Sequence, residues 1–247
     1  MKELMTTVQL RSTIFVQQNF GYTPETAKEF ASLLLPGAKE CGIAQPGVPM
    51  LGVNPTMPQY GLSWRLFKRV EGEGEYNIAF QPGKIDIILT KESAYLDDAE
   101  TAFCKKSIDW FKKILSKHSQ LKVLRIAYAP LYAIQRNGVG DMSFWGNFLR
   151  KPVIDGTQAQ DVNLQFLLKR PIDFGGRKVQ MNLLHQFFDG TQTKTNGDTM
   201  EVRDVLLVQL DLNSVPEKIL DFGGDDVATF FDGIISVKNT LIDNVEQ

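Results

Sequence analysis

The chain has 247 residues, of which 43% are hydrophobic and 23% are charged. A chain of this length and apolar content can bury a large core, which argues against a disordered protein. Its 27 Lys and Arg against 29 Asp and Glu give a formal charge of -2. This balance disfavours a dedicated duplex-DNA binder, because neutralising many phosphates takes a surplus of cations.

The cysteines and the N-terminus indicate a soluble intracellular protein. Cys41 and Cys104 form neither a disulfide framework nor a zinc spacing, as expected of thiols in a reducing compartment. Residues 1–11 mix polar and charged residues where a signal peptide needs an apolar stretch. No window reaches the roughly 18 consecutive apolar residues of a membrane-spanning helix. We therefore expect a cytoplasmic protein without membrane contact.

The first half of the chain predicts a strand, a helix, three strands and a second helix. Alternation over 5–18 predicts a half-buried strand, and Thr23 with Pro24 opens a helix that ends at Pro36 and Gly37. The next strands are expected at 62–71, 75–81 and 84–91, with short Gly-bearing separators that favour antiparallel hairpins. A long helix then runs from Asp97 to about Lys117, and Asp97 with Glu100 resembles a capping box.

Two features of this half have open alternatives. Residues 36–59 are dense in Pro and Gly and predict an irregular excursion, which is either a functional loop or a variable insertion. The polar face of the second helix is cationic and is either a solvated face or a nucleic-acid surface. That face carries Lys105, Lys106, Asp109, Lys112, Lys113 and Lys117.

The second half repeats the order of the first. Residues 122–135 predict a strand that Pro130 interrupts with a bulge or a sheet edge. A short helix over 141–149 is followed by strands at 161–172, 178–188 and 203–213, and by a final helix after Gly223 and Gly224. The first of these strands alternates Leu164, Phe166 and Leu168, and a Thr-, Asn- and Gly-rich loop is expected at 189–200.

This order predicts an α+β protein. Two pseudo-equivalent strand-helix-three-strand-helix halves, 1–120 and 121–247, are expected to form one curved, mainly antiparallel sheet with the long helices packed on one face. The abrupt join at 118–122 leaves no flexible linker, so we expect a single integrated domain over 1–247. Residue identity between the halves is poor, so the repeat is one of pattern.

A family resemblance is carried by short motifs. The strand Arg125-Ile126-Ala127-Tyr128, with Tyr132 beyond it, resembles the arginine-isoleucine-aromatic strand of a sporadically distributed, uncharacterised prokaryotic family of similar length. The hairpin at 81–85 and the helix with Phe230-Phe231 lie where that family has comparable features, whereas Pro130 departs from its pattern. The family has no established activity, so the resemblance implies a prokaryotic intracellular protein and no catalytic residue.

No linear motif in the sequence names a reaction. The phosphate-binding loop, the complete dinucleotide fingerprint, the H-E-x-x-H zinc signature and the G-x-S-x-G elbow are all missing from the sequence. Asp189, Asp198 and Glu201 lack the spacing of a calcium loop. We therefore expect no metal site, no cofactor and no catalytic residue.

The histidines and Cys104 each have a structural and a functional interpretation. His118 is expected at the C-terminus of a helix, where the helix dipole favours a positive imidazolium. A capping role is therefore favoured over a catalytic one. His185 is buried if it shares a face with its apolar neighbours Met181, Leu183 and Phe187, and is then a core histidine rather than a ligand or base. Cys104 is expected near the rim of the core, where neighbouring lysines would lower the pKa of an exposed thiol.

The candidate binding site is a group of polar and aromatic residues around the proline-broken strand. Tyr128 and Tyr132 share one face if Pro130 leaves the register unchanged, and aromatic and Arg side chains dominate interface hot spots. Core tyrosines with satisfied hydroxyls are the alternative. The candidate residues are Arg125, Tyr128, Tyr132, Arg136, Trp145 and His185.

These observations favour a non-catalytic binding protein that recognises a protein partner or a small ligand near 128–136, helped by 36–59. The alternatives are an enzyme with a motif-less Asp, Glu, Tyr, Arg and His site, and a nucleic-acid-binding accessory protein that uses the lysine-rich helix face. His185 bonded to a carboxylate in an open pocket would favour the enzyme. A closed, apolar setting around His185 would favour binding.

Overall fold

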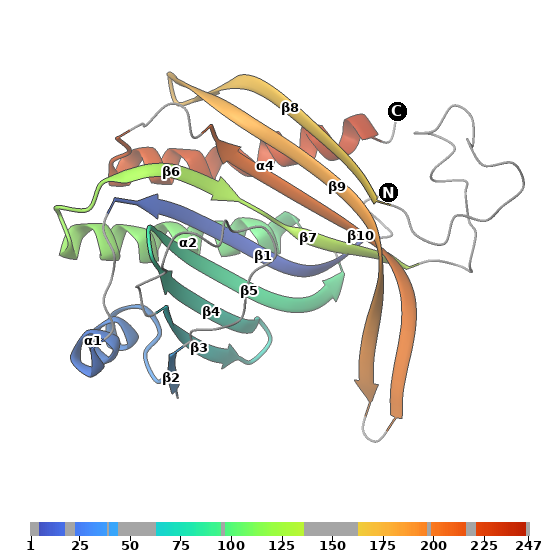
Figure 1. Cartoon of the computed structure of the whole chain (residues 1–247), viewed down its shortest axis with the longest axis horizontal. Helices are drawn as coiled ribbons and strands as arrows, with labels where there is room; N and C mark the ends of the chain where they lie inside the picture. Colours follow the sequence, from blue (N-terminus) through green and yellow to red (C-terminus); the bar gives the residue numbers. More distant parts are fainter. Residues whose placement is uncertain are drawn as a thin grey trace, which may run out of the picture.

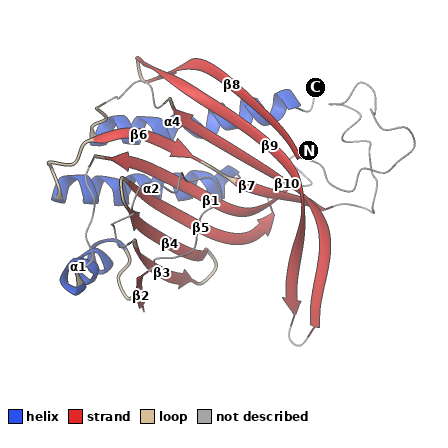
Figure 2. Cartoon of the chain, viewed as in Figure 1, coloured by secondary structure: helices blue, strands red, loops and turns tan. Residues whose placement is uncertain are grey.

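The protein is built on one antiparallel sheet with helices against it (Figure 1, Figure 2). The computed structural model describes residues 5–17, 23–38, 40–43, 63–94, 97–135, 163–196, 199–215 and 221–245. The helices are α1 (Pro24–Leu34), α2 (Asp97–Lys117) and α4 (Gly224–Val245). The strands are β1 (Met5–Val16), β2 (Glu40–Ile43), β3 (Trp64–Val70), β4 (Gly74–Gln81), β5 (Lys84–Ala94), β6 (Val123–Tyr128), β7 (Leu131–Gln135), β8 (Asn163–Phe174), β9 (Arg177–Asn196) and β10 (Thr199–Ser214). The prediction of an α+β protein with a mainly antiparallel sheet is confirmed.

The N-terminal strand lies in the middle of the sheet. The strand order is β2-β3-β4-β5-β1-β6-β10-β9-β8, and β7 pairs with β1 and β10 beside β6. In Figure 1, α2 and α4 lie side by side behind the sheet. The start of α1 follows the sequence signals: Thr23 accepts a hydrogen bond from the Thr26 amide at 3.1 Å and caps the helix, and Pro24 is its first residue.

Pro130 interrupts the strand that runs beside β1, as the sequence predicts. Proline has no amide hydrogen, so the ladder breaks and the segment becomes β6 and β7. The Ala129 amide bonds the Arg11 carbonyl at 2.8 Å, and the Leu210 amide bonds the Pro130 carbonyl at 3.1 Å. The register is the same on both sides of Pro130, with Ser12 opposite Tyr128 and Gln9 opposite Leu131. The irregularity of β1 lies beyond the break, between Thr7 and Gln9.

Two segments expected to be irregular contain strands. The loop predicted at 189–200 is wrong, because β9 and β10 stay paired from Met181 and Ser214 out to Asn196 and Thr199. Thr191, Thr193 and Thr195 supply β-branched side chains at alternate positions, which favours a strand. Within 36–59, residues 40–43 form β2, a short edge strand on β3. The rest of that excursion beyond Ile43 and the helix predicted at 141–149 lie outside the described residues.

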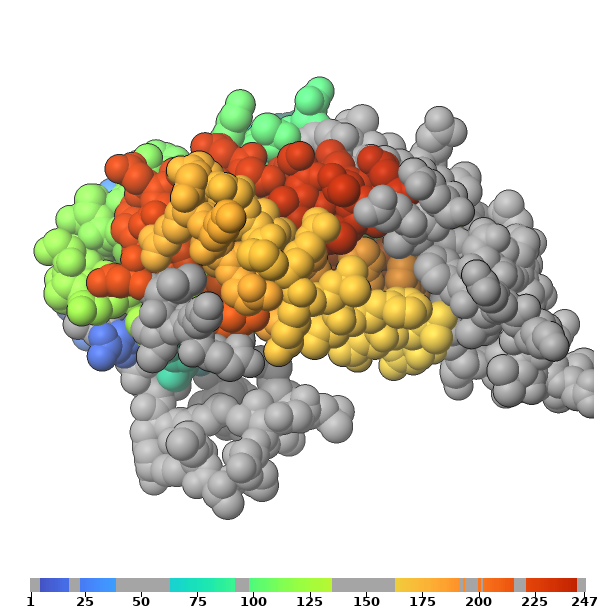
Figure 3. Space-filling view, turned by 90° about the horizontal axis from the view of Figure 1, so that it is seen from above, coloured from blue at the N-terminus to red at the C-terminus, as the bar shows by residue number. Residues whose placement is uncertain are grey.

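The two edges of the sheet are covered differently. Near the β2 edge, Phe30 of α1 packs against Trp64 of β3 and Phe80 of β4, with ring centroids 5.9 and 4.9 Å apart. At the other edge, α4 meets β8 through Phe230 and Phe174, whose centroids are 5.0 Å apart. Figure 3 looks onto this second edge and shows β8, in yellow, at the surface beside α4 in red.

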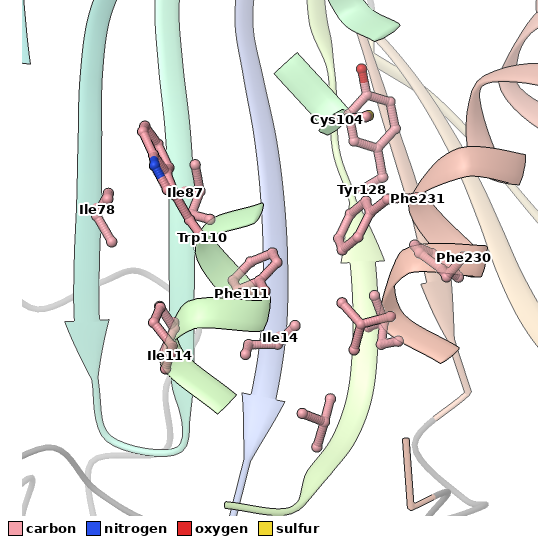
Figure 4. Close-up of a cluster of buried hydrophobic side chains, with 14 of the residues drawn as sticks. Ile14, Ile78, Ile87, Cys104, Trp110, Phe111, Ile114, Tyr128, Phe230 and Phe231 are labelled. Atoms are coloured by element: carbon pink, nitrogen blue, oxygen red, sulfur yellow. The ribbon is translucent and has the colours of Figure 1, made fainter. Parts of the chain in front are cut away.

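The main core fills the space between the sheet and the two long helices (Figure 4). Phe111 of α2 and Phe231 of α4 stack at 5.7 Å, which joins the helices directly over the sheet. Ile14 and Tyr128 come up from the central strands beneath them. Burying these apolar side chains supplies the main free energy that holds the helix layer on the sheet.

Candidate functional site

A charged cluster lies fully buried between the helices and the sheet. We name Glu100 of α2, Lys238 of α4, Tyr128 of β6 and Tyr132 of β7 the Glu100 centre. The Lys238 ammonium is 2.6 Å from Glu100 Oε2, and both side chains have 0% exposure. The Tyr128 hydroxyl donates to Glu100 Oε2 at 3.0 Å, and the Tyr132 hydroxyl donates to Glu100 Oε1 at 2.6 Å. Both carboxylate oxygens are therefore hydrogen-bonded inside the core.

The position of Glu100 corrects the capping-box prediction. A capping glutamate would turn back to the start of its own helix, whereas Glu100 points into the core and bonds residues from three other elements. Burying a carboxylate without partners is costly, so its cation and hydroxyl donors compensate for its lost hydration. Glu100 thereby ties α2 to α4 and to the central strands.

The electrostatics of the Glu100 centre keep the Tyr128 hydroxyl protonated. Burial raises the pKa of Tyr128 well above its usual range, and the Glu100 charge raises it further. Lys238 also lies 5.9 Å from the Tyr132 ring centroid, within the range of a cation–π contact. Tyr128 and Tyr132 share a face, as expected, and fit the alternative of core tyrosines with satisfied hydroxyls. Neither ring lies at the surface.

Cys104 lies beside this centre and not near the rim. It is buried among the residues of the main core, which corrects the expected position. Burial raises the pKa of the Cys104 thiol, and the Glu100 charge raises it further. A buried thiol that stays protonated is a small apolar core residue with little nucleophilic character.

Arg125 is on the opposite face of the sheet from Tyr128. Its strand partner in β1 is Phe15, over whose ring its guanidinium sits at 4.5 Å. The guanidinium also donates to Asn213 Oδ1 at 3.0 Å and to the Ser214 carbonyl at 3.1 Å. The structure thus separates Arg125 from the two tyrosines. Arg136 and Trp145 lie outside the described residues.

His185 is a buried histidine in an apolar setting. It has 6% exposure and shares a face with Met181, Leu183 and Phe187, as the sequence predicts. Burial alone lowers the pKa of the His185 imidazole. Within the described residues, its Nε2 atom has no hydrogen-bond partner. A neutral ring without a carboxylate partner is poorly suited to act as a general base.

The β8 edge presents a feature that the sequence analysis misses. Phe166, Leu167 and Leu168 are 43%, 53% and 52% exposed, although the alternation at 164–168 suggests a face turned to the core. Phe166 lies opposite His185 and Leu168 opposite Leu183, on the helix side, whereas Leu167 lies opposite Leu184 on the other side. The sequence signal for this exposed edge is the unbroken triplet Phe166-Leu167-Leu168, because three consecutive apolar residues make both faces of a strand apolar.

Comparisons with known proteins give no assignment. No family model matches the chain, and no curated protein and no solved structure matches it significantly. The resemblance to the uncharacterised prokaryotic family therefore stays a prediction from short motifs. Over the described ranges, no group of three His, Cys, Asp or Glu side chains could hold a metal ion. No helix in those ranges is long and apolar enough to cross a membrane.

Proposed function

We propose that the chain is a non-catalytic binding protein that recognises an extended polypeptide segment at the β8 edge. The observation that carries the proposal is the exposed triplet Phe166-Leu167-Leu168 on a strand that ends the sheet order. The outer backbone amides and carbonyls of an edge strand can pair with an added strand. Exposed apolar side chains on both of its faces add the contacts that favour such pairing.

The setting of the titratable groups supports binding over the enzyme alternative. His185 lies in the closed, apolar environment that the sequence analysis associates with binding. The carboxylate of Glu100 is held by Lys238 and two hydroxyls inside the core, out of contact with solvent. An enzyme would need a poised acid or base that a substrate can reach.

Ion pairs on α2 weigh against the nucleic-acid alternative. Lys106 lies 2.6 Å from Glu73, and Lys113 lies 2.7 Å from Asp109. Lys112 pairs with Asp225 and Lys117 pairs with Glu29. Because each of these cations faces a carboxylate, less positive charge is left for a phosphate backbone. Retention on a nucleic-acid column at low ionic strength would favour that alternative.

We also propose that residues 1–247 form a single domain with two pseudo-equivalent halves, 1–120 and 121–247. The strand order supports this proposal. Outward from the central β1–β6 pair, β5, β4 and β3 follow on one side, and β10, β9 and β8 follow on the other. The long helices α2 and α4 follow β5 and β10 in the chain. A prokaryotic, cytoplasmic protein is the expectation that accompanies this proposal, in line with a buried free thiol at Cys104.

Selection of displayed peptides tests the proposed function. Random peptides of about the length of β8 are selected on the intact protein, and the hits are measured on Leu167→Asp and on Val202→Asp. Val202 is a matched control because it is 55% exposed and lies outside β8, in the part of β10 that pairs only with β9 among the described residues. We expect Leu167→Asp to weaken binding by at least about tenfold and Val202→Asp to leave it unchanged. Hits that bind both variants equally, or a selection without hits, would refute a recognition site at β8.

A further inference from the structure

We infer that the face of the sheet away from the helices binds a small oxyanion, the carboxylate or phosphate group of a small molecule, between Arg11 of β1 and Arg125 of β6. In Figure 1 this face is turned toward the viewer, because α2 and α4 lie behind the sheet. The inferred site is independent of the proposed function, since it lies in the middle of the sheet and not at the β8 edge.

The strand register places the two arginines at opposite ends of a pair of small residues. Thr13 of β1 lies opposite Ala127 of β6. Arg11 comes two residues before Thr13, and Arg125 comes two residues before Ala127 on the antiparallel strand, so each starts about 7 Å from this pair. These four residues point away from the helices, because side chains alternate along a strand and the neighbours in the chain include members of the main core: Leu10, Ile14, Ile126 and Tyr128. Thr13 and Ala127 therefore form the floor between two cations.

Arg125 is held in position beside this floor. Its guanidinium lies 4.5 Å from the centroid of the Phe15 ring and donates to Asn213 Oδ1 at 3.0 Å. Asn213 is the strand partner of Ala127, so the guanidinium leans along the sheet toward the small pair. The ring contact and the hydrogen bond fix the planar guanidinium before any ligand arrives. A pre-oriented guanidinium suits the recognition of carboxylate and phosphate groups.

Arg11 supplies a buried donor that needs an acceptor. Its Nε atom is buried and, among the described residues, has no hydrogen-bond partner. A buried donor on a charged group loses its hydration without compensation, which is costly. A carboxylate or phosphate accepts from Nε and a neighbouring Nη together, and its charge neutralises the guanidinium. The unpartnered donor of Arg11 therefore favours an oxyanion over a neutral ligand.

Two carboxylates of the protein on the same face are engaged by other groups. Asp86 of β5 lies 3.1 Å from the Lys84 ammonium and accepts hydrogen bonds from two further side chains. Asp211 of β10 accepts from the Asn213 amide at 3.0 Å. In the part of the chain that the structure describes, neither carboxylate forms an ion pair with Arg11. The anion that neutralises Arg11 is therefore expected to come from outside the chain.

Arginine side-chain NMR on the full chain tests the inferred site. Inorganic phosphate and acetate are added separately, with chloride keeping the ionic strength constant. We expect a saturable shift of the Arg11 Nε–H resonance, which is assigned by its loss in Arg11→Lys. Arg11→Gln should raise the dissociation constant of the bound anion by at least about tenfold. Arg65→Gln is the matched control and should leave it unchanged, because Arg65 is an exposed arginine on the same face, on β3.

The outcomes separate the ligand classes and can overturn the inference. Saturation by phosphate alone supports a phosphate group as the ligand, and saturation by acetate alone supports a carboxylate. Circular dichroism with urea titration establishes that the variants are folded. An Arg11 resonance that neither probe shifts, a shift that rises without saturating, or equal losses of affinity in Arg11→Gln and Arg65→Gln overturns the inference. Peptides selected at β8 should bind Arg11→Gln as they bind the unmodified chain, because the two sites are separate.

Discussion

The Glu100 centre and the β8 edge both depart from the usual distribution, in which charged side chains are exposed and apolar side chains are buried. The Glu100 centre places a carboxylate and an ammonium at 0% exposure, whereas the β8 edge leaves Phe166, Leu167 and Leu168 about half exposed. A buried ion pair contributes less to stability than its Coulomb attraction suggests, because both ions lose their hydration. The comparison teaches that the core of this protein depends on mutual satisfaction of charges, whereas its β8 edge keeps apolar side chains at the surface.

Removing the cation from the Glu100 centre should have the largest effect on stability. Lys238→Met leaves the buried Glu100 carboxylate without its counterion, and we expect the free energy of unfolding to fall by about 3–5 kcal/mol in urea titrations. The control is Lys112→Met, which breaks an exposed ion pair with Asp225 and should leave stability nearly unchanged. Adding Glu100→Gln to Lys238→Met should restore part of the loss. Equal losses of unfolding free energy in Lys238→Met and in Lys112→Met would contradict a buried charged centre.

Removing one hydroxyl from the Glu100 centre should have a smaller effect. Tyr132→Phe deletes the donor that lies 2.6 Å from Glu100 Oε1, and we expect a loss of about 1.5–3 kcal/mol. Tyr128→Phe should cost less, because its 3.0 Å bond ends on Oε2, which Lys238 also contacts. The same urea titrations measure both variants. The reverse ranking would show that the carboxylate is held chiefly through Oε2.

The setting of His185, between the two regions, should appear as a pH dependence. Burial lowers the pKa of folded His185, so the unfolded chain binds the proton more readily. Stability should therefore fall as the pH drops below the unfolded histidine value of about 6.5, and His185→Leu should flatten this decline. His118→Leu is the control. Burial also lowers the pKa of His118, but its side chain is only half-buried, so this variant should flatten the decline in stability less than His185→Leu. An unchanged slope in His185→Leu would contradict this account.

A polar substitution at the β8 edge should leave stability almost unchanged. Leu167→Gln replaces a half-exposed side chain, and we expect a change in the free energy of unfolding within about 0.5 kcal/mol in urea titrations. Leu183→Ala, on the neighbouring strand but fully buried, should cost about 2–5 kcal/mol. A large loss in Leu167→Gln would mean that the triplet belongs to the core, and the comparison between centre and edge would then fail.

Local signals account for the parts of the fold that sequence reasoning predicts well. Thr23 and Pro24 set the start of α1, and Pro130 splits one strand into β6 and β7. Short glycine-bearing turns delimit the hairpins between β3, β4 and β5. In each case a residue and its immediate neighbours restrict the backbone, so distant contacts are not needed to predict the outcome.

The two predictions that failed, for Glu100 and for the strand at 164–168, depend on residues that are distant in the sequence. Glu100 has the spacing of a capping residue, and only the approach of Lys238, 138 positions later, makes it part of the core. The alternation of Leu164, Phe166 and Leu168 is that of a half-buried strand, but β8 is at the edge and its triplet stays exposed. Strand order and helix placement determine both outcomes, and neither can be read from the local pattern.

The separation of Glu100 from Lys238 also bears on the order of events during synthesis. The carboxylate leaves the ribosome 138 residues before the ammonium that neutralises it. Until α4 has been translated, α2 carries an acidic residue toward an interior that lacks both that cation and the Phe231 ring. The nascent N-terminal portion is therefore expected to wait, incompletely closed and open to chaperones, until the last helix emerges.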